Sequence, residues 1–133
     1  HGSTRSAQYV GGGIIFGPKP RDYSYTIPKK VRRLAMKSAF SAKMIDNKVI
    51  VVDGLAFDEI KTKKMVDVLK ALKVADSALV VLGEKNENVE LSARNIPTVK
   101  TAFTNTINVF DILKYDSFIM TKEAAEKIQE VYV

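Results

Sequence analysis

Beyond the first third of the chain, short apolar runs alternate with longer segments in which apolar residues recur every three or four positions. Residues 49–52 (VIVV) and 78–82 (ALVVL) contain no polar residue, which is typical of strands covered on both faces of a sheet. Residues 97–102 and 117–120 fit two further strands. Alternation of short apolar strands with helices predicts an α/β fold with three layers: a mainly parallel sheet of about four strands with covering helices.

The segments between these strands have the periodicity of amphipathic helices. We predict helices at residues 61–72, 86–95 and 108–113, and a last helix after residue 121. Asn86 or Asn88 and Thr121 have side chains suited to helix N-caps. In the last helix, the spacing predicts that the inward positions are Ala124, Ala125, Ile128 and Val131.

Residues 1–13 show neither the spacing of apolar residues that is typical of a helix nor the alternation that is typical of a strand. Residues 1–13 are small and polar and include three consecutive glycines, and two prolines follow at positions 18 and 20, which favour extended backbone over helix. We therefore divide the chain into an extended basic arm at residues 1–17 and a globular α/β domain at residues 18–133. Two alternatives remain for the arm: a disordered tail, or a segment that becomes ordered on a partner.

A helix is predicted from Pro28, suited to a first helical turn, to about Ile45. Its apolar and small residues recur at helical spacing and predict a narrow packing face made of Val31, Leu34, Ala35, Ser38, Ala42 and Ile45. Lys29, Arg33 and Lys37 stand four residues apart and form a second, cationic stripe. Like charges at this spacing repel each other by a few tenths of a kcal/mol per pair, a cost that phosphate groups would offset. A solvated helix face is the alternative.

The charge of the chain is concentrated in the same region. The net charge is +6, and residues 1–46 hold nine of the 21 Lys and Arg but only two of the 15 Asp and Glu. Such asymmetry indicates a polyanionic partner, most often nucleic acid. Cations beside tyrosines suit RNA, in which unstacked bases lie on aromatic rings; the alternative for Tyr23 and Tyr25 is packing in an edge strand. The candidate RNA-binding residues are Arg5, Gln8, Tyr9, Lys19, Arg21, Tyr23, Tyr25, Lys29, Lys30, Arg32, Arg33 and Lys37.

Enzymatic chemistry is not indicated. The chain has no cysteine and its single histidine is His1, which argues against thiolate and histidine-based sites. The glycines form neither a dinucleotide fingerprint nor a phosphate-binding loop, and Asp53 before Gly54 fits a turn. We expect no enzyme activity, no catalytic residue, no metal and no cofactor. No apolar run approaches the ~20 residues of a membrane span, and no signal-peptide pattern is present, so we expect a cytoplasmic protein without membrane contact.

Several long motifs carry a resemblance to a known family. The block GGGIIFGPKPRDYSYTIPKKVRRLAMKSAFSAK (residues 11–43) closely resembles the hallmark segment of the bacterial large-subunit ribosomal protein L-four family. Three later stretches are similar to the same family: NVELSARNI (residues 88–96), NVFDILKY (residues 108–115) and TKEA (residues 121–124). The likeness extends over essentially the whole chain.

The resemblance implies an rRNA-binding scaffold protein with an α/β domain and a long basic loop that penetrates the rRNA. In the family, the tip of that loop helps line the exit tunnel, and some members repress their own operon through its messenger leader. Residues 1–13 match the returning limb of the loop. The expected partners are 23S rRNA and neighbouring large-subunit proteins, with the operon mRNA as an alternative. A small nucleotide-using α/β enzyme is the least favoured function.

The sequence departs from the family in one respect. The family's opening strand, first helix, outgoing limb and loop tip precede the position at which this sequence begins, so tunnel contacts are not transferred to it. We expect a fragment whose sheet lacks a strand and a covering helix. A separate N-terminal piece, self-association or reorganisation would then cover the apolar surface left exposed.

Overall fold

A computed structural model describes residues 2–74 and 76–132 of the chain. The described residues form five helices and four strands in the order α1 (Lys29–Ile45), β1 (Val49–Val52), α2 (Thr62–Ala71), β2 (Ala78–Leu82), α3 (Glu87–Arg94), β3 (Val99–Phe103), α4 (Val109–Lys114), β4 (Ser117–Thr121) and α5 (Lys122–Tyr132). The predicted alternation of strands and helices is therefore confirmed.

The strands form one sheet of order β1-β4-β2-β3, in which every neighbouring pair is parallel. The register places Val80 of β2 between Ile119 of β4 and Thr101 of β3. All five residues of β2 are buried, as expected for a wholly apolar strand in the middle of a sheet. The strands β1 and β3 are the two edges. The expectation that residues 49–52 are covered on both faces is therefore wrong: none of the four is buried, and Val51 is 55% exposed.

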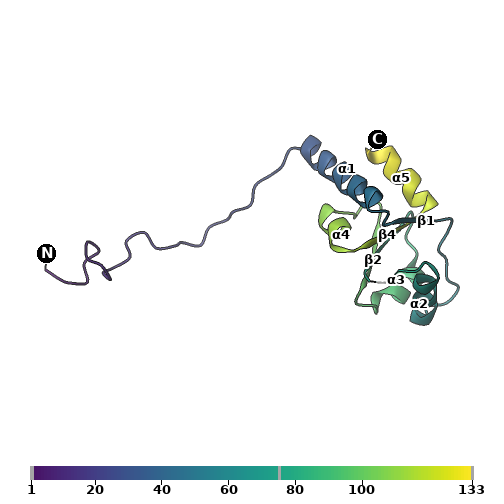
Figure 1. Ribbon diagram of the computed structural model, residues 1–133, viewed down its shortest axis with the longest axis horizontal. Helices are drawn as coiled ribbons and strands as arrows, with labels where there is room; N and C mark the ends of the chain where they lie inside the picture. The colour runs from purple at the N-terminus through teal and green to yellow at the C-terminus, as the bar shows by residue number, and fades with distance from the viewer. Residues whose placement is uncertain (1, 75, 133) are drawn as a thin grey trace.

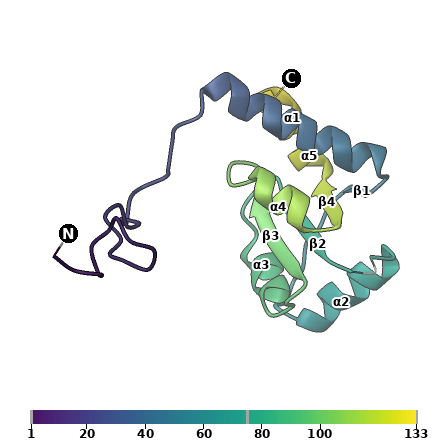
Figure 2. The ribbon, with the colours of Figure 1, turned by 60° about the vertical axis from the view of Figure 1, so that its left-hand side comes forward.

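Helices cover both faces of the sheet (Figure 2). On one face, α1, α4 and α5 pack over a cluster built around Phe118, Leu79 and Val81. On the other, α2 and α3 pack over a cluster around Val80 and Ile119. The predicted three-layer architecture is confirmed.

Side-chain caps fix the starts of three helices. The Oδ1 atoms of Asn86 and Asn108 accept hydrogen bonds from the first turns of α3 and α4, at 3.2 Å from Asn88 N and 2.7 Å from Asp111 N. The hydroxyl of Thr121 accepts a hydrogen bond from Ala124 N at 3.3 Å. Each cap satisfies a backbone donor that the helix itself leaves unpaired. Pro28 is the N-cap residue of α1, immediately before its first turn.

The packing face predicted for α1 is wrong. Val31, Leu34 and Ile45 are 50%, 63% and 79% exposed, and the small residues between them are exposed too. The face that meets the sheet carries Met36, Ala39, Phe40 and Lys43. This set also has helical spacing, and its larger side chains fill the space above β4, where Phe40 meets Phe118 edge to face at 5.7 Å between ring centroids.

A smaller correction applies to α5. Ala124 is fully buried, Ala125 is half-buried and Ile128 packs against the core, as predicted, but Val131 is 56% exposed. The next residue, Tyr132, packs instead, with its ring edge to face with that of Phe40 at 5.9 Å.

Residues 2–28 contain neither helix nor strand, and they lead away from the start of α1 (Figure 1). Residues 3–13 fold into a local loop that is closed by a 2.9 Å hydrogen bond from Gly13 N to the Arg5 carbonyl. Glycine is needed at position 12, because a Cβ there would lie 2.0 Å from the Ser6 carbonyl oxygen. The extended arm and its boundary at residue 17 stay predictions.

Candidate nucleic-acid interface

The cationic side chains of the first half of α1 lie on its solvent-exposed surface. Lys29, Lys30, Arg32, Arg33 and Lys37 are all exposed. No ion pair found among the described residues involves any of them. Lysine and arginine are good helix formers, so the stripe costs the helix little beyond its own repulsion. The result is a ridge of positive charge that α1 holds rigidly because its other face is packed on the sheet.

The end of α5 lies beside this ridge. Lys30, Arg33 and Lys37 line one wall of a hollow of about 650 Å³, and Val131 and Tyr132 contribute to the opposite wall. On the adjacent side, Arg32 and Arg33 border a smaller hollow of about 260 Å³ together with residues from α4 and α5. Sequence reasoning missed the α5 residues, because no local pattern indicates that the two ends of the described domain meet.

The segment that precedes α1 carries four of the candidate residues. Lys19, Arg21, Tyr23 and Tyr25 are all exposed. The guanidinium carbon of Arg21 lies 4.4 Å from the ring centroid of Tyr23, a cation–π contact, and Tyr23 as a residue remains 74% exposed. The structure thus brings this cation and this aromatic ring together, a combination that can stack an unpaired base.

A local turn organises the backbone around these two residues. The backbone N–H and the hydroxyl of Ser24 both donate hydrogen bonds to the Asp22 carboxylate, at 2.8 Å each. These bonds, the backbone one first, lower the pKa of Asp22 below its ordinary value. The Asp22 carboxylate is therefore engaged in the turn, and none of the ion pairs found among the described residues joins it to Arg21.

The remaining candidates lie in the glycine-closed loop. Arg5 and Tyr9 are exposed, and the carbonyl of each accepts a hydrogen bond from a glycine N–H, from Gly13 at 2.9 Å and from Gly12 at 3.0 Å. Gln8 is exposed in the same loop and makes an interaction of its own. Arg5 and Tyr9 thus lie in the same local loop. Residues 14–28 separate this loop from α1 (Figure 1).

Lys43 behaves differently from the other cations of α1. Its side chain is only 7% exposed, and its Nζ donates hydrogen bonds to the carbonyl oxygens of Tyr115 at 2.8 Å and Asp116 at 3.2 Å. The amine therefore joins α1 to the turn between α4 and β4. This cation is structural, and the spacing that it shares with Met36, Ala39 and Phe40 was the signal for it in the sequence.

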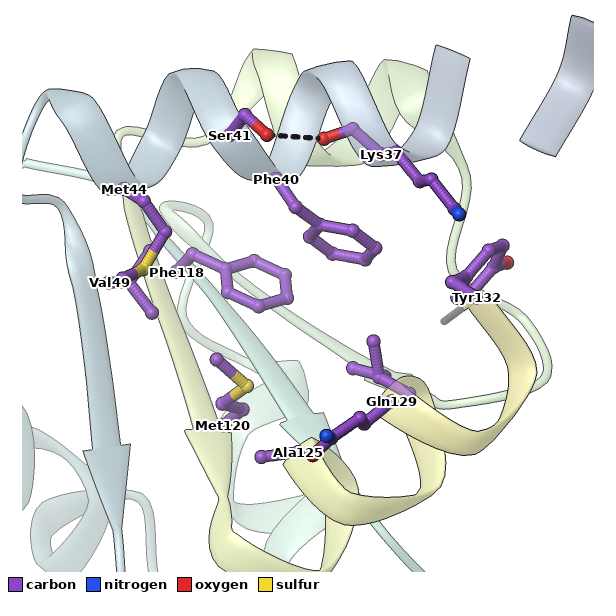
Figure 3. Close-up of a pocket in the computed structure, with 11 residues that line it drawn as sticks. Lys37, Phe40, Ser41, Met44, Val49, Phe118, Met120, Ala125, Gln129 and Tyr132 are labelled. Atoms are coloured by element: carbon purple, nitrogen blue, oxygen red, sulfur yellow. Dashed lines mark hydrogen bonds between the residues drawn. The ribbon is translucent and has the colours of Figure 1, made fainter. Parts of the chain in front are cut away.

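A second surface feature is an apolar groove of about 580 Å³ between α1 and α5 (Figure 3). Phe40 and Met44 line it from α1, Val49 from β1, and Phe118 and Met120 from β4. The adjacent edge strand β1 is wholly apolar, and Val51 is 55% exposed. An apolar groove beside an unprotected sheet edge is typical of a surface that another polypeptide covers.

The carboxyl ends of the strands, where α/β proteins often bind ligands, show a polar hollow of about 300 Å³. Asp53, Gly83, Glu84 and Glu123 lie there. Within the described ranges, no three His, Cys, Asp or Glu side chains are grouped so that they could hold a metal ion. Lys85, which lines this hollow, pairs with Glu87 at 3.1 Å. Lys127 is bonded to the Gly83 carbonyl and the Glu84 carboxylate, so the hollow offers no arrangement that we assign to catalysis.

Comparison with known proteins identifies the family. Residues 1–131 match the family model described as the ribosomal protein L4/L1 family. The chain belongs to this family. It is 64% identical over 131 residues to the large ribosomal subunit protein uL4 of Ruminiclostridium cellulolyticum and 62% identical over 133 residues to that of Acetivibrio thermocellus. It is also 62% identical over 131 residues to uL4 of Alkaliphilus oremlandii.

These alignments include 98%, 99% and 98% of the chain but 63%, 64% and 63% of the three uL4 proteins, so the chain spans less than two thirds of the length of these relatives. Membership in the L4/L1 family confirms the resemblance carried by residues 11–43 and by the three later motifs. In the part of this family member that the structure describes, no helix is both long enough and apolar enough to cross a membrane.

Proposed function

We propose that this chain acts as a structural, non-enzymatic part of the large ribosomal subunit in the cytoplasm, where it binds 23S rRNA and supports its assembly beside neighbouring ribosomal proteins. Three relatives at 62–64% identity are named large ribosomal subunit proteins. The observation that carries the proposal is the ridge of five exposed cations on α1, none of which takes part in an ion pair found among the described residues.

The mechanism is neutralisation of phosphates by a preformed surface. The ridge is held in place because α1 is anchored through Phe40 and Lys43, so the helix backbone does not have to become ordered on binding. The segment with Arg21 and Tyr23 and the loop with Arg5 and Tyr9 add cations and rings that can follow an RNA groove. Release of counterions from the phosphates supplies most of the affinity.

The test is a triple charge reversal of the stripe, Lys29→Glu, Arg33→Glu and Lys37→Glu. We expect this variant to lose binding to a 23S rRNA fragment in a filter-binding assay. The matched control reverses three exposed lysines of α2, namely Lys63, Lys64 and Lys70, which lie on the other side of the sheet (Figure 2). It changes the net charge by the same amount and is expected to bind RNA far better than the stripe variant.

Circular dichroism should show that both variants remain folded, because all six side chains are exposed. If the stripe variant binds as tightly as the wild type, or if the two variants lose affinity equally, the ridge is not the RNA-binding surface. An equal loss would indicate that net charge alone controls binding.

Autogenous regulation is the second candidate function. The same ridge would bind a hairpin in the leader of the operon mRNA, since phosphate contacts are independent of sequence. Competition between the rRNA fragment and the leader RNA tests this function. Mutual displacement supports one shared surface, whereas simultaneous binding of both RNAs contradicts it.

We further propose that the groove between α1 and α5 is covered by polypeptide from outside the stretch that this chain shares with its relatives. The uL4 protein of R. cellulolyticum is longer than the aligned stretch, and its unaligned part, supplied as a separate polypeptide, is the natural test. We expect a one-to-one complex and reduced binding of an apolar dye. Self-association of the chain would instead support a second copy in the groove. A monomer that melts cooperatively and binds no apolar dye would contradict both the covering polypeptide and the second copy.

A further inference from the structure

The hollow between α1 and the end of α5 combines two kinds of wall. One wall is cationic, with Lys30, Arg33 and Lys37 on successive turns of α1. The other wall is formed by Val131 and the ring of Tyr132. Its volume of about 650 Å³ lies within the range of small-ligand sites, about 300–1,000 Å³. The hollow is therefore large enough for more than a phosphate group alone.

The ring of Tyr132 is held in position rather than free to turn. It packs edge to face against Phe40 at 5.9 Å, with an angle of 66° between the ring planes. Figure 3 shows the Lys37 side chain leading from α1 toward this ring. A fixed aromatic ring beside lysine amines is the combination by which proteins bind single-stranded nucleic acid: the ring stacks a base and the cations meet the backbone.

Charge orients a ligand within the hollow. Glu130 contributes the acidic group on the α5 side, and a phosphate near that carboxylate would be repelled. The phosphates are therefore favoured on the α1 side, next to Lys30 and Lys37, and an uncharged base is favoured next to Val131 and Tyr132. This arrangement matches the two ends of one nucleotide.

We propose that this hollow is a subsite for an unpaired RNA nucleotide, in which Tyr132 stacks the base and Lys30 and Lys37 hold the adjacent phosphates. The subsite rests on the proposed function, because it lies on the same cationic ridge. It adds a specific contact from the far end of the sequence to an interface otherwise built from the first third of the chain.

The first test uses crosslinking of the unmodified chain. A short oligouridine that carries thiouridine is irradiated with the protein, and the crosslinked peptides are mapped by mass spectrometry. We expect a crosslink at Tyr132 or its immediate neighbours in α5. Crosslinks confined to residues 2–28 would overturn the subsite, and this measurement does not depend on the folding of any variant.

The second test compares Tyr132→Leu with Tyr132→Phe. Stacking on one base predicts that the Leu variant binds oligouridine about 5- to 150-fold more weakly, with an unchanged dependence on salt, because no charge is removed. The Phe variant retains the ring and should bind within about twofold of the wild type. Thermal melting of both variants separates lost packing against Phe40 from lost stacking.

The outcomes distinguish this inference from the proposed function. If Tyr132→Leu binds as the wild type does while the stripe reversal abolishes binding, the subsite is wrong and the ridge remains. If neither variant affects binding, the proposed RNA interface fails as a whole. A loss of affinity that is equal in Tyr132→Leu and Tyr132→Phe would also count against stacking.

Discussion

Replacing Lys43 by methionine separates the structural cation of α1 from the exposed ones. Methionine keeps the length and the apolar stem of the side chain, but it removes the amine that bonds to the Tyr115 and Asp116 carbonyls. A buried polar group that loses its partner costs about 1–3 kcal/mol. Both residues are half-buried, so the lower end applies to each carbonyl, and we expect the free energy of unfolding to fall by about 2 kcal/mol.

Urea unfolding followed by circular dichroism measures this change. The midpoint should fall while the dependence on denaturant stays constant, because the folded and unfolded states expose the same surface as before. The RNA affinity of the folded protein should not change. Lys37→Met is the matched control on the same helix: its side chain is exposed, so it should alter stability by less than about 0.5 kcal/mol and weaken RNA binding.

The reasoning is refuted if Lys43→Met is as stable as the wild type or more stable. Such a result is physically possible, because replacing a buried charge by an apolar side chain recovers the free energy of desolvation. It would mean that the two carbonyl contacts do not help to hold α1 on the sheet. A loss of RNA affinity in folded Lys43→Met would contradict its assignment as structural.

Three further predictions concern the body of the domain. Asn108→Ala removes the cap of α4 and should lower the free energy of unfolding by about 1 kcal/mol in urea titrations; an unchanged midpoint would show that the cap is dispensable. A hydrogen bond and charge attraction from Lys48 lower the pKa of Asp116 from 3.8, so its contribution to stability is present above that value and is lost as the pH falls through the folded pKa. Asp116→Asn should therefore be less stable than the wild type at neutral pH and equally stable in strong acid, as thermal melts across pH would show. Gly83→Ala places a Cβ 2.9 Å from the Glu123 Cβ and close to the backbone of α5, and calorimetry should show a loss of about 1–3 kcal/mol, whereas an unchanged melting temperature would contradict the close approach.

Local patterns in the sequence were sufficient to predict the helices and strands of this fold. The runs VIVV and ALVVL both predict strands, and ALVVL is buried throughout as β2. VIVV forms the edge strand β1 and leaves Val51 55% exposed, because a local run cannot show where its strand lies in the sheet. The caps at Asn86 and Thr121 are confirmed predictions, because each cap bonds to a backbone N–H within three positions. The cap at Asn108 was not predicted, although it is equally local. The order β1-β4-β2-β3 was not predictable, since it depends on which strands each helix crosses over.

The candidate site was predictable to a similar degree. Exposure of Lys29, Arg33 and Lys37 follows from the cost of burying unpaired charge. The helix α1 carries two stripes with helical spacing, however, and local periodicity could not decide which of them meets the sheet. The choice depends on Phe118 and on the Tyr115 carbonyl, more than 70 residues away. Tyr132 is also far from α1 in the sequence, which concealed its position beside the ridge.

The central claim is that the cations of α1 and the preceding segment meet the phosphates of a folded RNA. The most direct measurement is the affinity of the intact chain for a 23S rRNA fragment as a function of salt concentration. If about six phosphates are neutralised, log affinity should fall against log salt with a slope magnitude of about 4–5, and the triple reversal of Lys29, Arg33 and Lys37 should remove at least about two of those units. A slope near zero, or one that the triple reversal leaves unchanged, would contradict the account.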